Sequence, residues 1–407
     1  MTAASGAYKR VIIKKEVERG VLPTASGAQL LRRVEAFNNL SKDLYQSEEQ
    51  RSDFQTVDER HGVRRVAATL NAELSPGTYA AQVGSLLKRD FTTLTSLTGL
   101  SLTIAAGVAP AWVITRATGS WLTDGVKVGR VCRLTAGTFN AANLNKNLLV
   151  TAVTALGLTV VSVNGSALAV QGTAVTGATM AFPGRVTFTP ETGHTDDSYS
   201  VEEFWADVLQ SETYTGIKYN KAAISLPPTG MARINFSGTG KDLGRAETTQ
   251  YFTSPAPLGS ASVTAAINGA LIIDGVRVAS LTALSFDVDA AYEGDPTVGS
   301  NTLEYMVPGA VMVKGQFTAY WEDRTLDARF VNETAASLVV VAATSSADAA
   351  DFVAFTMTRV KLNSADKNDA KTGQQRTYSF TALRDMTGGA GLATESTTLM
   401  VQDSLAA

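Results

Sequence analysis

Residues 38–91 decide the fold of this chain and read NNLSKDLYQSEEQRSDFQTVDERHGVRRVAATLNAELSPGTYAAQVGSLLKRDF. Between Val66 and Leu74 apolar and polar residues alternate, and this period of two indicates a half-buried strand. Ser75-Pro76-Gly77 then breaks the strand. Apolar residues recur afterwards at helical spacing, at Tyr79, Val83, Leu86 and Leu87. The stretch therefore predicts a strand, a turn and an amphipathic helix.

A long charged loop precedes this strand. It covers residues 41–62, about twenty positions where a connection usually has a few, and follows a strand expected at 31–40. Acidic and basic residues interleave along it, so it is too polar to be buried within one subunit. Such a loop is either disordered or reserved for a partner.

Two basic pairs flank the loop, Arg32-Arg33 before it and Arg64-Arg65 at its end, on strands that we expect to be adjacent. Arginine pairs can bind phosphates, but no aromatic residues interleave with these pairs as they do in proteins that bind single-stranded nucleic acid. Pairing with loop carboxylates of a neighbouring copy is the better interpretation.

The composition favours a mainly β protein. The chain has 407 residues, which suggests two or three domains, and is rich in Thr, Val, Ala and Gly. One cysteine and two histidines exclude a disulfide within the subunit and a typical structural zinc site. No stretch approaches the roughly twenty apolar residues that span a bilayer, and the first residues lack the apolar core of a signal peptide. We expect a soluble protein made in the cytoplasm.

The formal net charge of −3 hides an asymmetry along the chain. Residues 1–92 contain 14 Lys and Arg against 11 Asp and Glu, and residues 93–185 contain 6 against 1. Residues 186–407 contain 15 against 26 and are acidic. Copies stacked head to tail would gain from this polarity, and an acidic channel lining would repel nucleic acid. The alternative interpretation is solubilising charge without a partner.

The organisation predicted from these patterns is a discontinuous β-sandwich domain, residues 1–92 and 186–383, interrupted by an inserted small β domain at 93–185. The insert is nearly free of charge and contains strands at 129–135, 148–153 and 158–163, spaced as in a small barrel or sandwich. Residues 384–407, rich in Gly, Thr and Ser, predict a flexible tail or docking arm.

Strands are also expected in the C-terminal half, the last of them marked by Tyr378 and Phe380. Asn164-Gly165 and Asp274-Gly275 predict hairpin turns. Residues 199–209 instead predict a helix capped by Ser198 or Ser200, since apolar residues recur at helical spacing. The expected strands of this half lie at 222–226, 232–237, 270–273, 276–278, 281–289, 311–321 and 352–360.

No pattern predicts catalysis, a cofactor or a metal ion. Gly238-Thr239-Gly240-Lys241 lacks the spacing of a phosphate-binding loop, so a turn is favoured. Asp287 and Asp289 share a strand face as expected of a polar face, and His61 lies among arginines of the loop. Asp196-Asp197, Asp348 and Asp351 are more typical of solvated loops than of a cation site. We therefore predict that the chain is not an enzyme.

A series of short motifs resembles the tail tube proteins of long-tailed bacteriophages. In chain order these are Leu31-Arg32-Arg33-Val34, Ser41-Lys42-Asp43-x-Tyr45-Gln46-Ser47, Arg51-Ser52-Asp53, Arg60-His61-Gly62-Val63-Arg64-Arg65 and Glu73-Leu74-Ser75-Pro76-Gly77-Thr78-Tyr79. The C-terminal half fits the same family in pattern only, and residues 93–185 fit it least.

The resemblance implies a β-sandwich with a flanking helix that forms hexameric rings around an inner β-barrel. Rings would stack into a tube through which double-stranded DNA passes during ejection, without sequence-specific binding. The partners implied are further copies of the chain and the tape measure, terminator and distal tail proteins, with assembly in the host cytoplasm, residence in the virion and no membrane contact.

By the same resemblance the 41–62 loop reaches the adjacent ring, with residues 1–20 and the tail from 384 as second candidates for contact. The inserted domain is expected on the outside of the tube. The candidate contact residues within the loop are Asp43, Tyr45, Glu48, Arg51, Asp53 and Arg60, and the basic residues at possible subunit contacts are Arg32, Arg33, Arg64 and Arg65.

Two alternatives stay open on the sequence. One is a single-ring relative of the tube protein, such as a tail terminator or baseplate hub. The other is a carbohydrate-binding tail-fibre protein, which would need an exposed aromatic groove with carboxylates. The chain has four tryptophans, and we expect at least Trp205 and Trp321 to lie in the core.

Overall fold

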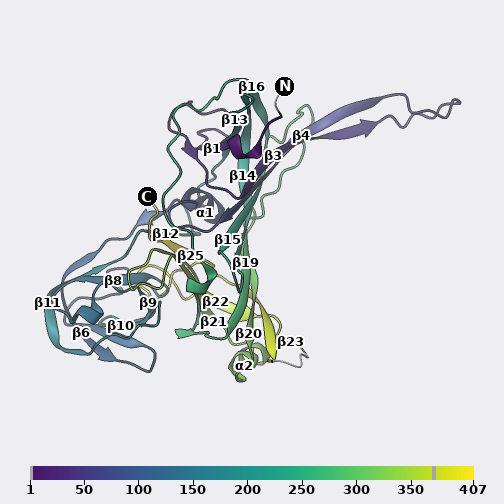
Figure 1. The fold of residues 1–407 in the computed structure, drawn as a ribbon. Coiled ribbons are helices and arrows are strands. Elements are labelled where there is room, and N and C mark those ends of the chain that lie inside the picture. The colour runs from purple at the N-terminus through teal and green to yellow at the C-terminus, as the bar shows by residue number, and fades with distance from the viewer. Residues whose placement is uncertain (1–2, 369–372) are drawn as a thin grey trace.

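The computed structural model of the chain describes residues 3–368 and 373–407. Strands dominate this part of the chain, as the composition predicts, and two α-helices accompany them (Figure 1). Figure 1 shows an elongated sheet, a separate group of strands at its lower left and a two-stranded arm that projects at the upper right. The mainly β prediction is confirmed.

A continuous sheet joins 19 strands of the described chain. Their bounds are β1 Lys9–Lys15, β2 Gln29–Leu30, β3 Glu35–Gln46, β4 Glu59–Glu73, β5 Thr92–Thr93, β12 Arg185–Phe188, β13 Tyr199–Trp205, β14 Gln210–Leu226, β15 Arg233–Gly240, β16 Asp242–Glu247, β17 Gly269–Ile273, β18 Val276–Arg277, β19 Leu281–Asp289, β20 Met312–Tyr320, β21 Ala336–Ala343, β22 Phe352–Leu362, β23 Asp366–Lys367, β24 Gln375–Ala382 and β25 Met400–Asp403. The helices are α1 Ala80–Leu87 and α2 Thr325–Val331.

Strand β14 belongs to both halves of this sheet. Its first half pairs with β13 and β16, and its second half pairs with β15 and β19. Gly216 lies where the halves meet, with φ +69° and no room for a Cβ beside Lys241. The buried carboxylate of Glu16 accepts the Gly216 N–H at 2.8 Å and the hydroxyls of Ser198 and Ser200. The carboxylate thus holds the backbone at the point where the pairing partners of β14 change.

The largest apolar core extends across both halves of the sheet and includes residues of α1. Strand β4 contributes alternate buried residues from Val66 to Ala72, as its sequence predicts. Helix α1 begins after Ser75-Pro76-Gly77 and buries Leu86 and Leu87, so the predicted strand, turn and helix are confirmed. The Tyr79 hydroxyl donates to the Arg32 carbonyl, which ties the helix start to the segment before β3.

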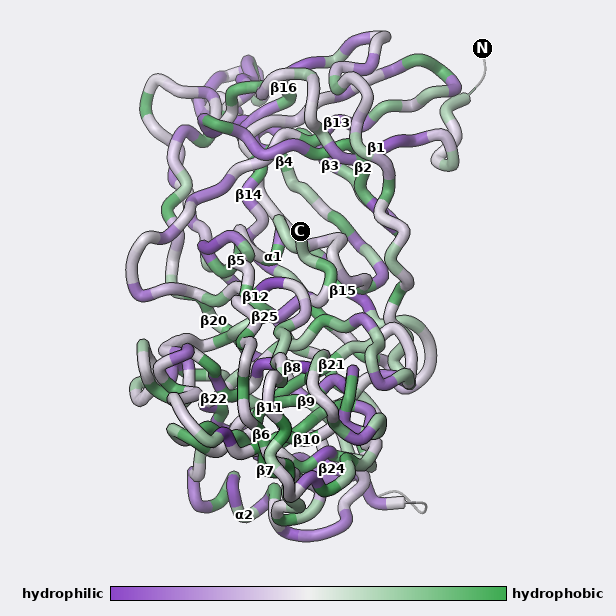
Figure 2. The backbone as a smooth tube through the Cα atoms, turned by 90° about the vertical axis from the view of Figure 1, so that its left-hand side faces the viewer, coloured by the Kyte–Doolittle hydropathy of each residue, from purple (hydrophilic) through white to green (hydrophobic). Residues whose placement is uncertain are grey.

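A closed six-stranded barrel forms from residues between 97 and 181. In chain order its strands are β6 Leu97–Ala106, β7 Trp112–Arg116, β8 Val131–Ala136, β9 Leu148–Val153, β10 Gly157–Ser162 and β11 Gln171–Ala181. It has its own core around the fully buried Trp121. In Figure 2 the barrel strands β6, β9 and β10 are drawn largely in the green of hydrophobic residues. Division of the chain into a sandwich and an inserted domain remains a prediction.

The barrel is held against the sheet by apolar and polar contacts. Val131 and Leu149 on its outer face form one buried cluster with Val341 and Phe352 of β21 and β22. The side chain of Gln402 in β25 accepts the Val131 N–H at 2.8 Å and donates to the Val131 carbonyl at 3.0 Å. These contacts fix the barrel beside the lower half of the sheet (Figure 1).

The predicted helix over 199–209 is wrong, because Tyr199–Trp205 is strand β13, paired with β1 and β14. Both faces of this strand are buried, which removes the alternation that marks a half-buried strand. Glu202 is acceptable there because its carboxylate accepts the Ser211 hydroxyl and the N–H groups of Tyr251 and Phe252.

The expected flexible tail also differs from the structure. Met400–Asp403 forms β25, buried between β12 and β22, so β24 is not the last strand. Its polar neighbours in sequence hid a strand of four residues. Asn164-Gly165 is a turn but not a hairpin turn, since β10 pairs with β9 and β7 and the next strand pairs elsewhere. Asp274-Gly275 does join a hairpin, β17 to β18.

Truncation after Leu399 tests the role of the last strand. Removing residues 400–407 should lower the free energy of unfolding by more than about 3 kcal/mol, since Met400 and Val401 are buried and each such side chain is worth about 1.5–3 kcal/mol. Chemical denaturation measures the difference, with the half-exposed Leu405→Ala as the control. An unchanged midpoint for the truncated chain would show that the segment is a tail.

Candidate assembly interface

The predicted loop at 41–62 is mostly a β-hairpin arm. Strand β15 covers β4 only as far as Val66. Beyond it β3 and β4 pair with each other, from Ser41 opposite Arg65 to Gln46 opposite Glu59, and Arg64 alone makes a further bridge, to Thr302. Only the tip, residues 47–58, is irregular, and its residues from 48 onward are all exposed. The sequence pattern missed the strands because the residues of the arm are exposed or half-buried on both faces, with the exception of Val63.

Two contacts stiffen the arm along its length. The register of β3 against β4 shifts between Lys42 and Leu44, and Asp43 at this bulge accepts from Arg65 at 2.6 Å. The Tyr45 ring lies directly over Gly62, where a Cβ would collide with it. Both pairs join β3 to β4 within the arm, and neither contacts the body of the protein.

Most charges in the tip are paired locally. Arg51 lies 3.2 Å from Asp53, and Arg60 lies 2.9 Å from Asp58, all on exposed side chains. Exposed pairs of this kind contribute about 0–1 kcal/mol to stability. Glu48 makes no ion pair with the described residues, and Phe54 is 97% exposed. The tip therefore offers an apolar ring and free carboxylate to solvent.

The base of the arm is fixed by residues 299–304. The Arg64 N–H donates to the Asn301 carbonyl at 2.8 Å, and the Arg64 guanidinium lies 2.9 Å from the Asp242 carboxylate. Glu304 at the end of this segment accepts from Lys241 at 2.7 Å and from the hydroxyls of Thr302 and Ser300. The hydrogen bond from Lys241, followed by those from the hydroxyls, lowers the pKa of Glu304 to about 2.

The basic pairs do not lie on adjacent strands as predicted, because Arg32 and Arg33 precede β3 in a segment without strand structure. Arg32 donates to the Ala261 carbonyl at 2.5 Å, and Arg33 donates to the Lys9 carbonyl. Arg64 and Arg65 are in β4 and pair with carboxylates of their own chain. Contact of any candidate residue with a neighbouring copy remains a prediction.

The remaining polar clusters have structural partners. Asp196 accepts from Lys218 at 2.6 Å and Asp348 accepts from Asn164 at 2.7 Å, while Gly238 and Gly240 are inside β15. The described residues contain no group of three metal-ligating side chains. Burial raises the pKa of the Cys132 thiol to about 12, which keeps it protonated and unreactive.

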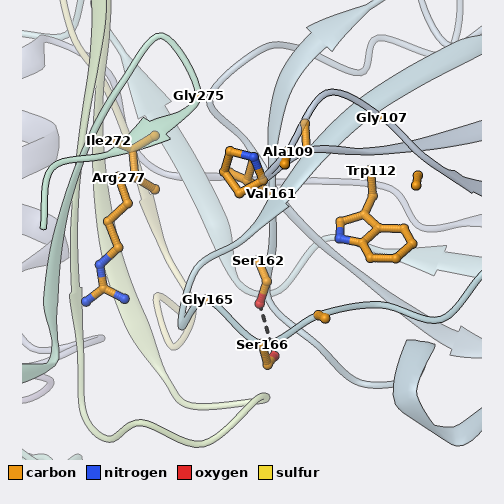
Figure 3. A pocket seen from close by; sticks show the side chains of 14 residues that line it. Gly107, Ala109, Trp112, Val161, Ser162, Gly165, Ser166, Ile272, Gly275 and Arg277 are labelled. Atoms are coloured by element: carbon orange, nitrogen blue, oxygen red, sulfur yellow. Dashed lines mark hydrogen bonds between the residues drawn. The ribbon is translucent and has the colours of Figure 1, made fainter.

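A pocket of about 310 Å³ lies between the barrel and the β17–β18 hairpin (Figure 3). Trp112, Val161 and Ile272 line it together with one cation, Arg277. Ser162 and Ser166 share a hydrogen bond of 3.2 Å across its floor. None of its described lining residues is a carboxylate or histidine, so it supplies no general acid or base.

The tryptophans only partly match the expectation of a core position. Trp321 is 41% exposed, with its indole N–H donating to Asp327 and the Arg376 guanidinium 4.4 Å from its ring centre. The prediction of a core residue is wrong there because β20 ends at Tyr320 and the alternating pattern runs past it. Trp205 is half-buried, and Lys9 lies over its ring.

Comparison with protein families gives a match to "Phage tail tube protein" over residues 6–382, which includes the arm, the sheet up to β24 and the barrel. The chain belongs to the phage tail tube protein family. A comparison with curated proteins finds no match. Family membership makes this a structural tail tube protein and a component of the virion. No helix in the described ranges has the length and hydropathy to span a membrane.

The contacts of Glu304 that support the base of the β3–β4 arm should weaken at acid pH. The depressed pKa of Glu304 adds stability that is present above its unfolded pKa near 4.5 and is lost as the pH falls toward about 2. Thermal unfolding of the wild type and of Glu304→Gln should differ at pH 6, with the wild type more stable, and converge near pH 2. A difference between the two that stays constant over this range would contradict the assignment.

Proposed function

We propose that this tail tube protein assembles as hexameric rings that stack into a tube, and that the β3–β4 arm makes the contact between copies. The observation that carries the proposal is the arm itself, two strands with an exposed tip beyond the edge of the sheet. An isolated two-stranded hairpin is marginally stable in water, so an arm of this length needs a second surface to bind.

The sheet edge supports the same proposal. Strand β3 (Glu35–Gln46) pairs only with β4 among the described residues, so its other side has no strand partner, although the Lys9 ammonium donates to the Ala36 carbonyl. Open strand edges invite pairing with other chains, and closure into a ring removes them. A ring of copies joined at this edge would continue the sheet into the inner barrel that the family resemblance implies.

Within such a tube, the barrel of residues 97–181 lies on the outside and the DNA passes through the lumen during ejection into the host. The acidic character of residues 186–407, with 26 Asp and Glu against 15 Lys and Arg, suits a lining that repels phosphates rather than binding them. Further partners at the tube ends are the tape measure, terminator and distal tail proteins, and assembly takes place in the host cytoplasm.

Negative-stain electron microscopy of the purified, concentrated chain tests this function directly. Long hollow tubes with a regular ring repeat are the expected result. Single rings would instead favour a terminator or hub relative. A uniform monomer that binds glycans would overturn the proposal and favour the tail-fibre alternative, for which the exposed Trp321 is the place to look.

Replacing the arm tip tests its part in polymerisation. Gln46 and Glu59 are directly opposed, so Asn-Gly in place of residues 47–58 closes the hairpin with a favoured two-residue turn. We expect a variant with the unfolding midpoint of the wild type that forms no tubes in the microscope. Tubes of normal length from this variant would show that the tip is dispensable.

A further inference from the structure

A basic groove lies beside the start of β1. It has a volume of about 430 Å³ and an apolar floor that includes Val11 and Leu31, both nearly inaccessible to solvent. Leu258, 52% exposed, stands on its rim. The cations that line it are Lys9, Arg10, Arg32 and Arg33.

Three of these cations have no carboxylate partner in the described chain. The Lys9 ammonium is paired with Glu203 at 2.5 Å, but Arg32 and Arg33 donate to uncharged acceptors only. Arg10 is exposed and makes no ion pair with the described residues. No Asp or Glu lines the groove, so it carries a surplus of positive charge around an apolar floor.

The tip of the β3–β4 arm has the complementary character. Residues 47–58 contain four carboxylates and one cation, Arg51. Ion pairs engage Asp53 and Asp58, whereas Glu48 and Glu49 make no ion pair with the described residues. Phe54 lies between these charges with 97% of its surface exposed. A ring this exposed gains free energy by entering an apolar pocket.

We propose that the arm tip of one copy docks into the basic groove of an adjacent copy. Phe54 then packs against Leu31 and Leu258, and Glu48 and Glu49 face the cations that line the groove. The inference rests on the proposed function, because it names the receiving surface for an arm that joins copies.

Other pockets suit the tip less well. The pocket beside α2, about 330 Å³, is lined by Glu322 and Asp323 as well as by arginines, so it would repel an acidic segment. The pocket at Trp112 offers a single cation, Arg277. Charge complementarity therefore selects the groove at Arg10.

The proposed contact joins two different surfaces of the chain. Such a head-to-tail interface does not close on itself in a pair of copies. It continues from copy to copy and generates rings or filaments, as a tube requires.

Disulfide cross-linking between two variants tests the contact. One variant carries Gln55→Cys, which leaves Phe54 in place, and the other carries Leu258→Cys. The native Cys132 is buried and does not compete. The control replaces Leu258→Cys by Tyr320→Cys, a residue of similar exposure (48%) beside the α2 pocket. The variants are mixed, concentrated, oxidised and analysed by non-reducing electrophoresis and electron microscopy.

Linked pairs of Gln55→Cys with Leu258→Cys, and none with Tyr320→Cys, are the expected result. Tubes without this link, or with the link to Tyr320→Cys, would overturn the proposed docking of the tip in the groove and leave the proposed tube function intact. The expected link without tubes would support the groove and count against stacking. If Leu258→Cys does not fold, Arg10→Cys takes its place in the same comparison.

Charge variants in the cross-linking pair separate specific docking from random collision. Arg10→Glu should slow the cross-linking rate about tenfold, because it places like charges opposite each other, and Glu48→Lys with Glu49→Lys in the partner should restore it. The matched control is Lys314→Glu, at an exposed cation of β20 that lies outside the groove. An equal effect of Arg10→Glu and Lys314→Glu would contradict the proposal.

Discussion

The shared strand β14 is the constraint on which the rest of this structure depends. It pairs with four strands along its length, two in each half of the sheet, so the two halves share one strand. The two sets of partners meet at Gly216, where the buried Glu16 carboxylate accepts the backbone N–H. A buried carboxylate is stable only when donors surround it, and here backbone and hydroxyl donors do so.

This arrangement separates a rigid body from an exposed arm. The body joins its strands into one continuous sheet, and its barrel is attached through the Val131–Gln402 contact and an apolar cluster. The arm extends β3 and β4 past the last strand that covers them, so its stability and its role both depend on another surface. Self-assembly of a tube protein requires a rigid body that supports an arm whose polar and apolar groups are free to bind another copy.

Sequence patterns predicted strands correctly where a strand has one solvent-exposed face and one buried face. The alternation from Val66 to Leu74 and the strand at 281–289 are found as predicted, and Asp274-Gly275 forms its hairpin. Sequence patterns failed where a strand is buried on both faces or largely exposed on both faces. β13 is buried on both faces and resembled a helix, while the arm is largely exposed on both faces and resembled a loop.

For the candidate interface, too, some features could be predicted from the sequence and others only from the structure. The sequence alone determined the family resemblance, the mainly β class and the residues of the arm, because local alternation and short motifs survive without knowledge of partners. Only the tertiary structure decided that Arg64 and Arg65 pair within the chain, that residues 400–403 are a strand, and that Arg10, Arg32 and Arg33 line one groove. These contacts form between segments that are far apart in the chain. A local sequence pattern carries no information about such contacts.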